Sequence, residues 1–277
     1  MLNSHKFLIN ADDYGRDKET IKNINKLIKL KKLDAVSTFV NFEKNLNFLS
    51  KESKKKLKVN LHLNLTEGRP ISKSSIVSKY LCDEKNFFKF SAIQYILMSA
   101  FNNENIKRAL QIEINAQIYL FKKKFKILNI DGHQHIHFIP IIFFQILKLH
   151  KRYKVNFFRN SKEKIYLSLL LDFKNYYFLN ILKVLFLNTM SIIIRKYLLK
   201  NNIYFNDEVF GILNSGNLNN NLIKKMKKKF NLKNNFIFIL HPGYKDKTKN
   251  SDYEMTYYYK KEREIEFNLT KEIKNIL

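Results

Sequence analysis

The stretch KILNIDGHQHIHFIPIIFFQILKLHKRYKVNFFRN, residues 126–160, reads as a strand, a helix and a second strand in succession. KILNIDGHQHIH has the pattern of a strand, IPIIFFQILKLHKRY that of a helix, and VNFFRN that of a short strand. Two strands joined by a helix form a parallel βαβ unit. This stretch therefore predicts an α/β fold, either a barrel or an open parallel sheet.

The same alternation continues outward along the chain. Strand-like runs occur at HKFLINADD (5–13), AVSTFVN (35–41), LKVNLHLNL (57–65) and NFIFILHPGY (235–244), and helical sections at ETIKNINKLIKLKKL (19–33) and about 87–124. The 277 residues contain no internal repeat and no Pro/Gly/Ser-rich linker. We therefore expect a single domain over residues 1–277.

Polar side chains follow the strand-like runs at the points where these end. They are Asp12 and Asp13, His62, Asp131 and His133, Arg159, and His241. Because the carboxyl ends of parallel strands lie at one rim of a sheet or barrel, we expect these groups to meet there.

Histidines at alternate positions in DGHQHIH (131–137) indicate a metal site. On one strand, positions i and i+4 lie ~13 Å apart, so this strand cannot supply all three imidazoles to one ion. The partners must come from elsewhere, and Asp12, Asp13 and His62 are the candidates. Two histidines and one carboxylate suit Zn²⁺, Mn²⁺ or Fe²⁺, and with water ligands they also serve Mg²⁺.

The pair Asp12–Asp13 offers more than a metal ligand. Neighbouring residues at a strand end point in different directions, so one carboxylate can bind metal while the other acts as a general base on water. A histidine on the opposite side, such as His241, could protonate the leaving group. Together these groups predict metal-assisted hydrolysis of a carbonyl compound.

Charge and cysteine content bear on location and partners. The 51 Lys+Arg against 24 Asp+Glu give a net charge of +27, but the lysines are scattered and form no groove with interleaved aromatic residues. We expect a solvated basic surface and no nucleic-acid partner, with attraction to anionic lipid as the alternative. Cys82 is the only cysteine, which fits a reducing cytoplasm. The first residues lack the apolar segment of a signal peptide, so we expect a cytoplasmic protein.

Residues 161–204 depart from the alternation of strands and helices. They are very apolar, but Asp172, Lys174, Lys183 and Arg195 interrupt them. The uncharged runs are too short for a bilayer span, so we expect no spanning helix. The favoured interpretation is a pair of core-packed helices, and the alternative is a membrane-surface or lipid-binding helical insertion with basic flanks.

Taken together, these motifs resemble the YdjC-like carbohydrate deacetylases, a family that includes chitooligosaccharide deacetylases and hopanoid-biosynthesis-associated deacetylases. The matching stretches are INADDYG (9–15), LHLNLTEGRP (61–70), Glu113 and Gln117, NIDGHQHIHFIP (129–140), Arg159, VFGILNSGNL (209–218) and LHPGY (240–244). They occur in the family's order up to about residue 245. Tyr14 stands where the family usually has Phe, and the proline expected soon after Arg159 is missing.

The resemblance implies a distorted TIM-like (β/α) barrel with an apolar helical insertion at about 161–204. It also implies metal-dependent removal of an acetyl group from an N-acetylated amino sugar, with one divalent ion, Mg²⁺ or Zn²⁺. The ligands carried over are Asp13, His62 and His133. By analogy with NodB-type deacetylases, Asp12 matches the general base, and His241 matches the acid or oxyanion partner. His135, His137, Arg159 and Thr66 are expected behind the ligands or at the substrate rim.

The apolar 161–204 section, followed by VFGILNSGNL, resembles the hopanoid-associated branch more than the chitooligosaccharide branch. We therefore expect a lipid-linked amino sugar presented at an anionic membrane surface and peripheral association with that membrane. The family resemblance also implies a homodimer. Three alternatives stay open: a metal-dependent hydrolase of a different ester or amide, a phosphoester hydrolase, or a basic nucleic-acid- or membrane-binding protein without catalysis. The phosphoester reading calls for a second metal or a Gly-rich phosphate loop, and the six glycines form no such loop.

Overall fold

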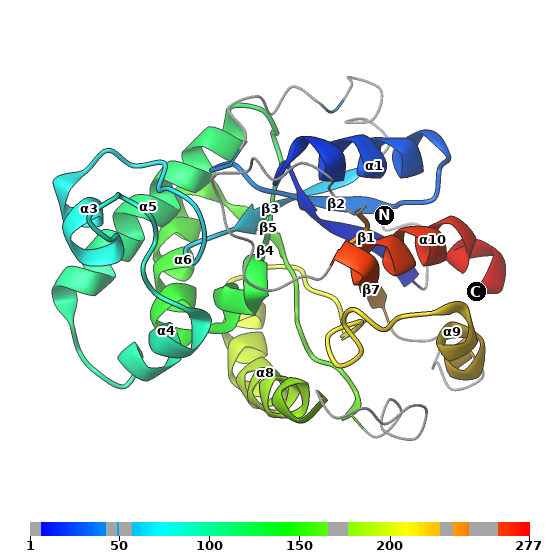
Figure 1. The fold of residues 1–277 in the computed structure, drawn as a ribbon. Helices are drawn as coiled ribbons and strands as arrows, with labels where there is room; N and C mark the ends of the chain where they lie inside the picture. The colour runs from blue at the N-terminus through cyan, green and yellow to red at the C-terminus, as the bar shows by residue number, and fades with distance from the viewer. Residues whose placement is uncertain (1–6, 43–48, 50–56, 166–176, 228–234, 244–259) are drawn as a thin grey trace.

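In the computed structural model of the chain, seven parallel strands form one curled sheet (Figure 1). The structure describes residues 7–42, 49, 57–165, 177–227, 235–243 and 260–277. The strands are β1 (Phe7–Tyr14), β2 (Ala35–Thr38), β3 (Lys58–Leu63), β4 (Leu128–Gly132), β5 (Val155–Phe158), β6 (Glu208–Phe210) and β7 (Phe236–Leu240). Their order across the sheet is β5-β4-β3-β2-β1-β7-β6. The predicted α/β class is confirmed, but the described strands form a half-barrel with edges at β5 and β6, not a closed TIM-like barrel.

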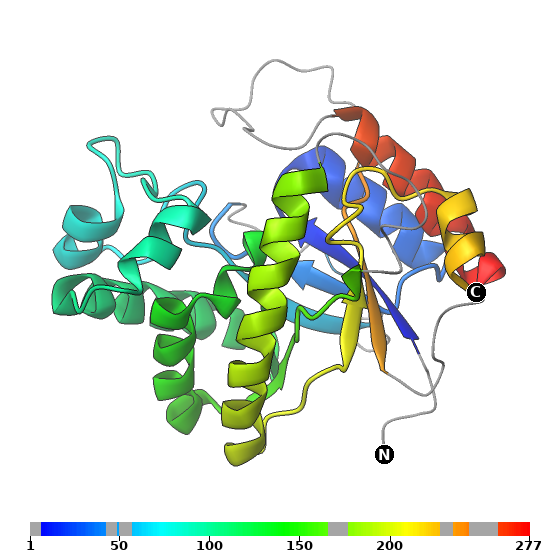
Figure 2. The same cartoon turned by 90° about the horizontal axis from the view of Figure 1, so that it is seen from below.

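The helices pack around this sheet in two groups. They are α1 (Lys18–Lys29), α3 (Ser75–Leu81), α4 (Ala92–Met98), α5 (Glu104–Lys122), α6 (Pro140–Tyr153), α8 (Tyr177–Lys200), α9 (Asn220–Lys227) and α10 (Lys260–Ile276). In Figure 1, α3 to α6 lie on one side, and α1, α9 and α10 lie on the other. Figure 2 shows α8 between the two groups.

Local sequence signals explain why these helices begin where they do. Asp17 caps α1 by accepting a hydrogen bond from the Thr20 amide at 2.7 Å, and α6 begins at Pro140, whose missing N–H costs nothing at a helix start. The helical section expected at about 87–124 is divided into α4 and α5. Ser91 starts α4 with a capping box, and Asn103 caps α5.

The histidine stretch differs from the predicted strand. β4 ends at Gly132, and His133–Phe138 form a 3₁₀ segment, η2. Within η2, Gln134 and His135 have φ values of 51° and 60°, in the left-handed region that side chains other than glycine rarely adopt. The prediction that 126–137 forms one strand is therefore wrong, and the three histidines do not share a strand face.

Backbone pairing and one side-chain amide join β5 to the chain that precedes β6. Phe158 donates its backbone N–H to the Tyr204 carbonyl at 2.9 Å, and Tyr204 donates to the Asn156 carbonyl at 3.1 Å. Beyond this short pairing, the backbone N–H of Asn160 donates to Asn206 Oδ1 at 2.8 Å, and Asn206 Nδ2 donates to the backbone carbonyl of Asn160 at 2.8 Å. We call this Asn160–Asn206 contact the amide seam.

The apolar 161–204 section contains one long helix, α8, and residues 166–176 lie outside the described part of the chain. The core-packed interpretation holds for one face of α8 only, where Val184, Leu187, Ile194 and Leu198 are buried. By length and composition α8 could also cross a bilayer, and only 28% of its most apolar window is buried. The expectation that no helix spans a membrane stays a prediction, because this test uses length and composition alone.

Candidate metal centre and catalytic site

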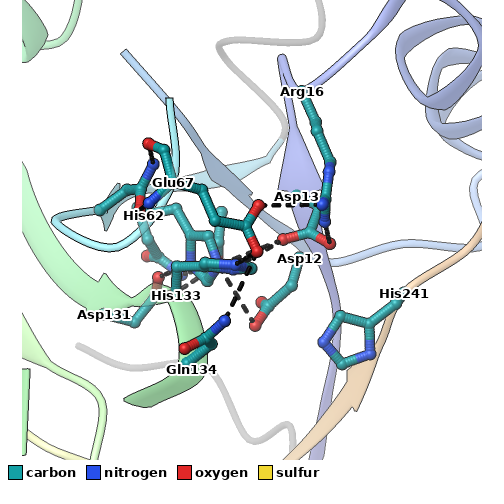
Figure 3. Close-up of polar contacts among 12 residues, drawn as sticks. Asp12, Asp13, Arg16, His62, Glu67, Asp131, His133, Gln134 and His241 are labelled. Carbon is teal, nitrogen blue, oxygen red and sulfur yellow. Dashed lines mark hydrogen bonds and ion pairs between the residues drawn. The ribbon is translucent and has the colours of Figure 1, made fainter. Parts of the chain in front are cut away.

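The candidate site lies at the carboxyl ends of three strands. Asp12 and Asp13 come from the end of β1, His62 from β3, and His133 directly follows β4 (Figure 3). Asp13 has φ 66°, so the backbone turns there and sends the two neighbouring carboxylates in different directions. The sequence prediction that these groups converge at one rim agrees with this arrangement.

Asp13, His62 and His133 present three buried ligand atoms that all lie within 4.8 Å of one another. Asp13 Oδ1 is 3.5 Å from His62 Nε2 and 3.3 Å from His133 Nδ1. Ligand atoms bound to one ion at about 2.0–2.2 Å lie roughly 3.0–3.5 Å apart in octahedral or tetrahedral geometry. The three side chains are thus spaced as ligands of a single divalent ion.

The electrostatics of this group also fit a cation. Asp13 Oδ1 is buried and has no hydrogen bond of good geometry among the described residues, although it faces two imidazoles. Burial alone lowers the pKa of His62, but Asp12, Asp13 and Asp131 outweigh it and raise that pKa to about 10. The surrounding carboxylates therefore favour positive charge at this point.

A second cluster, Asp12, His62 and Asp131, also has the spacing of a metal site. Arg159 already neutralises the two carboxylates of this cluster, because Nη1 of this arginine lies 2.7 Å from Asp12 Oδ1 and 3.3 Å from Asp131 Oδ2. A guanidinium between the two carboxylates repels a second cation. The first group is the better candidate for the metal.

Asp131 lies behind His62 and fixes its imidazole. Asp131 Oδ1 is 2.6 Å from His62 Nδ1, and its Oδ2 accepts bonds from Ser37 Oγ at 2.5 Å and Asn60 Nδ2 at 3.1 Å. A proton on Nδ1, shared with this carboxylate, leaves Nε2 free to face Asp13. Carboxylate–histidine pairs of this kind orient metal ligands in proteins.

Glu67 has the corresponding position behind His133 and was not among the predicted site residues. Its Oε1 is 3.1 Å from His133 Nε2, and its Oε2 accepts a bond from Arg16 at 2.9 Å. Burial raises the pKa of Glu67, but His133 and then Arg16 lower it below its ordinary value. Glu67 is part of the quoted LHLNLTEGRP motif, so the signal was present without an assigned role.

The turn that carries Glu67 is organised by Asn64. Asn64 Oδ1 accepts the backbone N–H groups of Thr66 at 3.1 Å and Glu67 at 3.2 Å. The Thr66 hydroxyl also points to Asn64 Oδ1, at 3.3 Å. In this arrangement Thr66 supports the turn, and its expected place at the substrate rim stays a prediction.

Arg159 binds the Asp12 carboxylate through two parallel hydrogen bonds. Arg159 Nη1 and Nη2 donate to Asp12 Oδ1 and Oδ2 at 2.7 and 2.8 Å, and both side chains are buried. Burial raises the pKa of Asp12, but the Arg159 guanidinium outweighs it and holds the pKa well below its ordinary range. Arg159 thus fixes the orientation of this carboxylate and keeps it ionised.

His135 and His137 contact residues that directly follow β5. His135 Nδ1 is 2.9 Å from Ser161 Oγ, and His137 Nε2 is 3.0 Å from the Arg159 carbonyl. Burial holds the pKa of His135 well below its ordinary value and lowers that of His137 to about 3, so both rings stay neutral near pH 7. His137 is fully buried, whereas His135 lies nearer to the surface.

His241 follows β7 and lies across Asp12 from His133 (Figure 3). Its Nδ1 is 3.4 Å from Glu266 Oε2, and its backbone N–H donates to the same oxygen. Glu266 belongs to α10, as does Arg263, whose Nη2 donates to Asp13 Oδ2. No local pattern in the sequence marked these two α10 residues, because their partners lie far away along the chain.

Comparisons with known proteins identify the family of the chain. Residues 6–277 match the family model described as YdjC-like protein. A carbohydrate deacetylase of Xenopus laevis is 26% identical over 153 residues, which cover 53% of this chain and 48% of that protein, so the match spans about half of the relative's length. The fold is also that of an Enterococcus faecalis V583 protein, whose crystal structure names it as a proposed cellobiose-phosphate cleavage protein. The two structures superpose with a TM-score of 0.69 at 20% sequence identity, and the match covers 98% of this chain and 92% of that one. The chain belongs to the YdjC-like protein family.

Proposed function

We propose that this protein is a metal-dependent hydrolase that removes the acetyl group from an N-acetylated amino sugar. The observation that carries the proposal is Asp13 Oδ1 facing two imidazole nitrogens at 3.3 and 3.5 Å, with the second carboxylate of Asp12 beside them. Family membership and the name of the Xenopus laevis relative support the choice of an acetylated sugar over other carbonyl compounds.

Each residue of the site has a role in this reaction. Asp13, His62 and His133 would hold the ion, Mg²⁺ or Zn²⁺, which supplies polarisation of the acetyl carbonyl and acidification of water. Asp12, oriented by Arg159, accepts the proton of the attacking water. His241, on the other side of Asp12, gives a proton to the departing amine nitrogen. General acid–base catalysis by such groups contributes about 10²–10⁴-fold to the rate.

The test is acetate release from N-acetylglucosamine oligosaccharides and glycolipids, with metal analysis, for wild type, Asp13→Ala and His133→Ala. We expect acetate from wild type alone, together with loss of bound metal in both variants. Metal bound through these residues without acetate from any acetylated sugar would make the reaction wrong and leave the metal site standing. If neither substitution changed the metal content, the assignment of the metal site would be wrong as well.

We further propose that the substrate is lipid-linked and that the protein associates with anionic membrane through α8. Its outward face carries exposed apolar side chains, namely Phe178, Leu179, Leu182, Leu185, Ile192, Ile193 and Leu199. The charged residues of α8 are all basic, and the exposed ones, Lys196 and Lys200, complement an anionic lipid surface. α8 also lies beside the site, because Asn188 and Ser191 bond to Glu163 and Asn160 just beyond β5.

Vesicle flotation tests this surface without any substrate. We expect wild type to float with vesicles of phosphatidylcholine and phosphatidylglycerol and not with phosphatidylcholine alone. Leu182→Glu with Ile192→Glu should abolish flotation, whereas Ile93→Glu, at an exposed apolar position on α4, should leave it unchanged. Wild type that stays unbound with anionic vesicles at low salt would refute the membrane proposal. The cytoplasmic location and the homodimer stay predictions.

A further inference from the structure

The C-terminal helix α10 places two buried charged residues against the two sides of the candidate site. Arg263 and Glu266 are three residues apart and therefore lie on the same face of the helix. Arg263 Nη2 donates to Asp13 Oδ2, and Glu266 Oε2 accepts the backbone N–H of His241. One turn of α10 thus contacts both the proposed metal ligand and the proposed acid.

Backbone contacts show that this docking is tight. Glu266 Oε1 accepts the N–H of Gly216 at 2.9 Å, and Gly243 donates its N–H to the Arg263 carbonyl at 3.1 Å. A Cβ added at Gly243 would lie 3.2 Å from the Arg263 side chain, and one at Gly216 would lie 3.2 Å from Glu262. The backbone at Gly216 and at Gly243 therefore rests on α10, because these glycines permit a close approach.

Each charge has a defined geometric effect. Arg263 and Arg16 both approach Asp13 Oδ2, which leaves Oδ1 of the same carboxylate turned toward His62 and His133. Glu266 Oε2 lies 3.4 Å from His241 Nδ1, so it favours a proton on Nδ1 and turns Nε2, which carries the proton that the acid gives up, toward the reacting atoms.

We propose that Arg263 and Glu266 are positioning residues: Arg263 fixes the rotation of the Asp13 carboxylate for metal binding, and Glu266 fixes the ring and tautomer of His241. This inference rests on the proposed function for the roles of Asp13 and His241. Arg263 and Glu266 themselves act through these neighbours and do not touch the reacting atoms. The C-terminal helix is accordingly part of the site and not only a cover for the sheet.

The Arg263 arm is tested by metal affinity, which needs no substrate. Arg263→Lys keeps the charge and loses the planar fork, and Arg263→Met keeps most of the apolar stem and loses both. Because the orientation of Asp13 is the proposed function, both variants should bind Zn²⁺ or Mg²⁺ about 10–100-fold more weakly, as expected for residues that orient metal ligands. If Arg263→Met binds metal more tightly than wild type, Arg263 merely opposes the cation, and the proposal is overturned.

The Glu266 arm is tested by the ¹⁵N NMR signals of the His241 ring in Glu266→Gln. We expect a proton on Nδ1 in wild type, a partial loss of that proton in the variant, unchanged metal affinity, and a fall in kcat of at least tenfold with little change in KM. Glu272→Gln, at an exposed position of the same helix, is the matched control and should change none of these. Unfolding temperatures identify any variant that fails to fold.

The outcomes separate the two proposals. If wild type binds metal but releases no acetate, the deacetylase assignment fails, while the metal-affinity and tautomer results still decide the roles of Arg263 and Glu266. If acetate is released and Glu266→Gln changes neither the tautomer nor kcat, the positioning role of Glu266 is refuted and the deacetylase assignment stands.

Discussion

Replacing Asp131 by asparagine is expected to weaken metal binding without removing any ligand. Asp131 is fully buried and its two oxygens have different partners: Oδ1 faces His62 Nδ1 at 2.6 Å, while Oδ2 accepts from Ser37 and Asn60 and lies 3.3 Å from Arg159. If asparagine turns its oxygen toward His62, its NH₂ group faces the donors of Ser37, Asn60 and Arg159, and two donors then meet without an acceptor. The opposite rotamer forces the His62 proton onto Nε2, where the ion would bind.

The size of the effect follows from this conflict. Residues that orient a ligating histidine typically contribute 10–100-fold to metal affinity. For Asp131→Asn this corresponds to about 1.4–2.8 kcal/mol of binding free energy. Arg159 keeps its two bonds to Asp12, so the variant retains that buried ion pair, and we expect it to fold.

Competition between the protein and a chelator for Zn²⁺ measures this loss directly. Ser37→Ala is the matched control, since it removes a bond to Oδ2 and leaves the contact with His62 intact. We expect the control to bind metal nearly as well as wild type. Asp131→Asn with wild-type affinity, in a variant that unfolds cooperatively, would show that the carboxylate behind His62 does not govern the site.

Three further predictions concern stability. Gly211 has φ +119°, and an added Cβ would lie 2.4 Å from the Ile239 carbonyl oxygen, so Gly211→Ala should cost about 1–3 kcal/mol and lower the unfolding temperature in a thermal melt. Burial, and after it Arg159, lowers the pKa of His137 to about 3. The neutral ring therefore contributes its full stability above about pH 6.5, and this contribution is lost as the pH falls toward 3. His137→Gln should flatten the pH dependence of urea unfolding in that window by up to about 1.4 kcal/mol per pH unit. Glu163 accepts three backbone N–H groups that follow β6, and Glu163→Gln, which turns an NH₂ toward one of them, should destabilise the protein by about 1–3 kcal/mol in the same urea assay at pH 8. An unchanged melt, pH profile or urea midpoint would contradict the respective prediction.

The sequence predicted those parts of the fold that repeat a regular pattern. The apolar spacing of α1 and α6 and the buried runs of β1, β3 and β7 have the periods of helices and strands. Convergence of Asp13, His62 and His133 followed from parallel strands alone, because β1, β3 and β4 end at one rim.

Other features depend on conformations or contacts that no local pattern encodes. The 3₁₀ segment η2 exists because Gln134 and His135 adopt left-handed backbone angles, and the alternation of histidines indicated a strand instead. β6 is three residues long, too short to give a strand signal. Arg263 meets Asp13 across 250 positions of the chain, a separation at which spacing carries no information.

The amide seam has a consequence for how such proteins diversify. The Asn206 carboxamide holds the backbone of Asn160, on the β5 side of the half-barrel, to the approach to β6, and the 45 residues between them include α8. Together with the backbone pairing of Phe158 with Tyr204, the seam holds both ends of this segment at fixed places beside the half-barrel. Side chains on the outward face of α8 can therefore change while Asp13, His62 and His133 keep their places. Substrate range can then change in one module of the molecule without any change to the chemistry in the other.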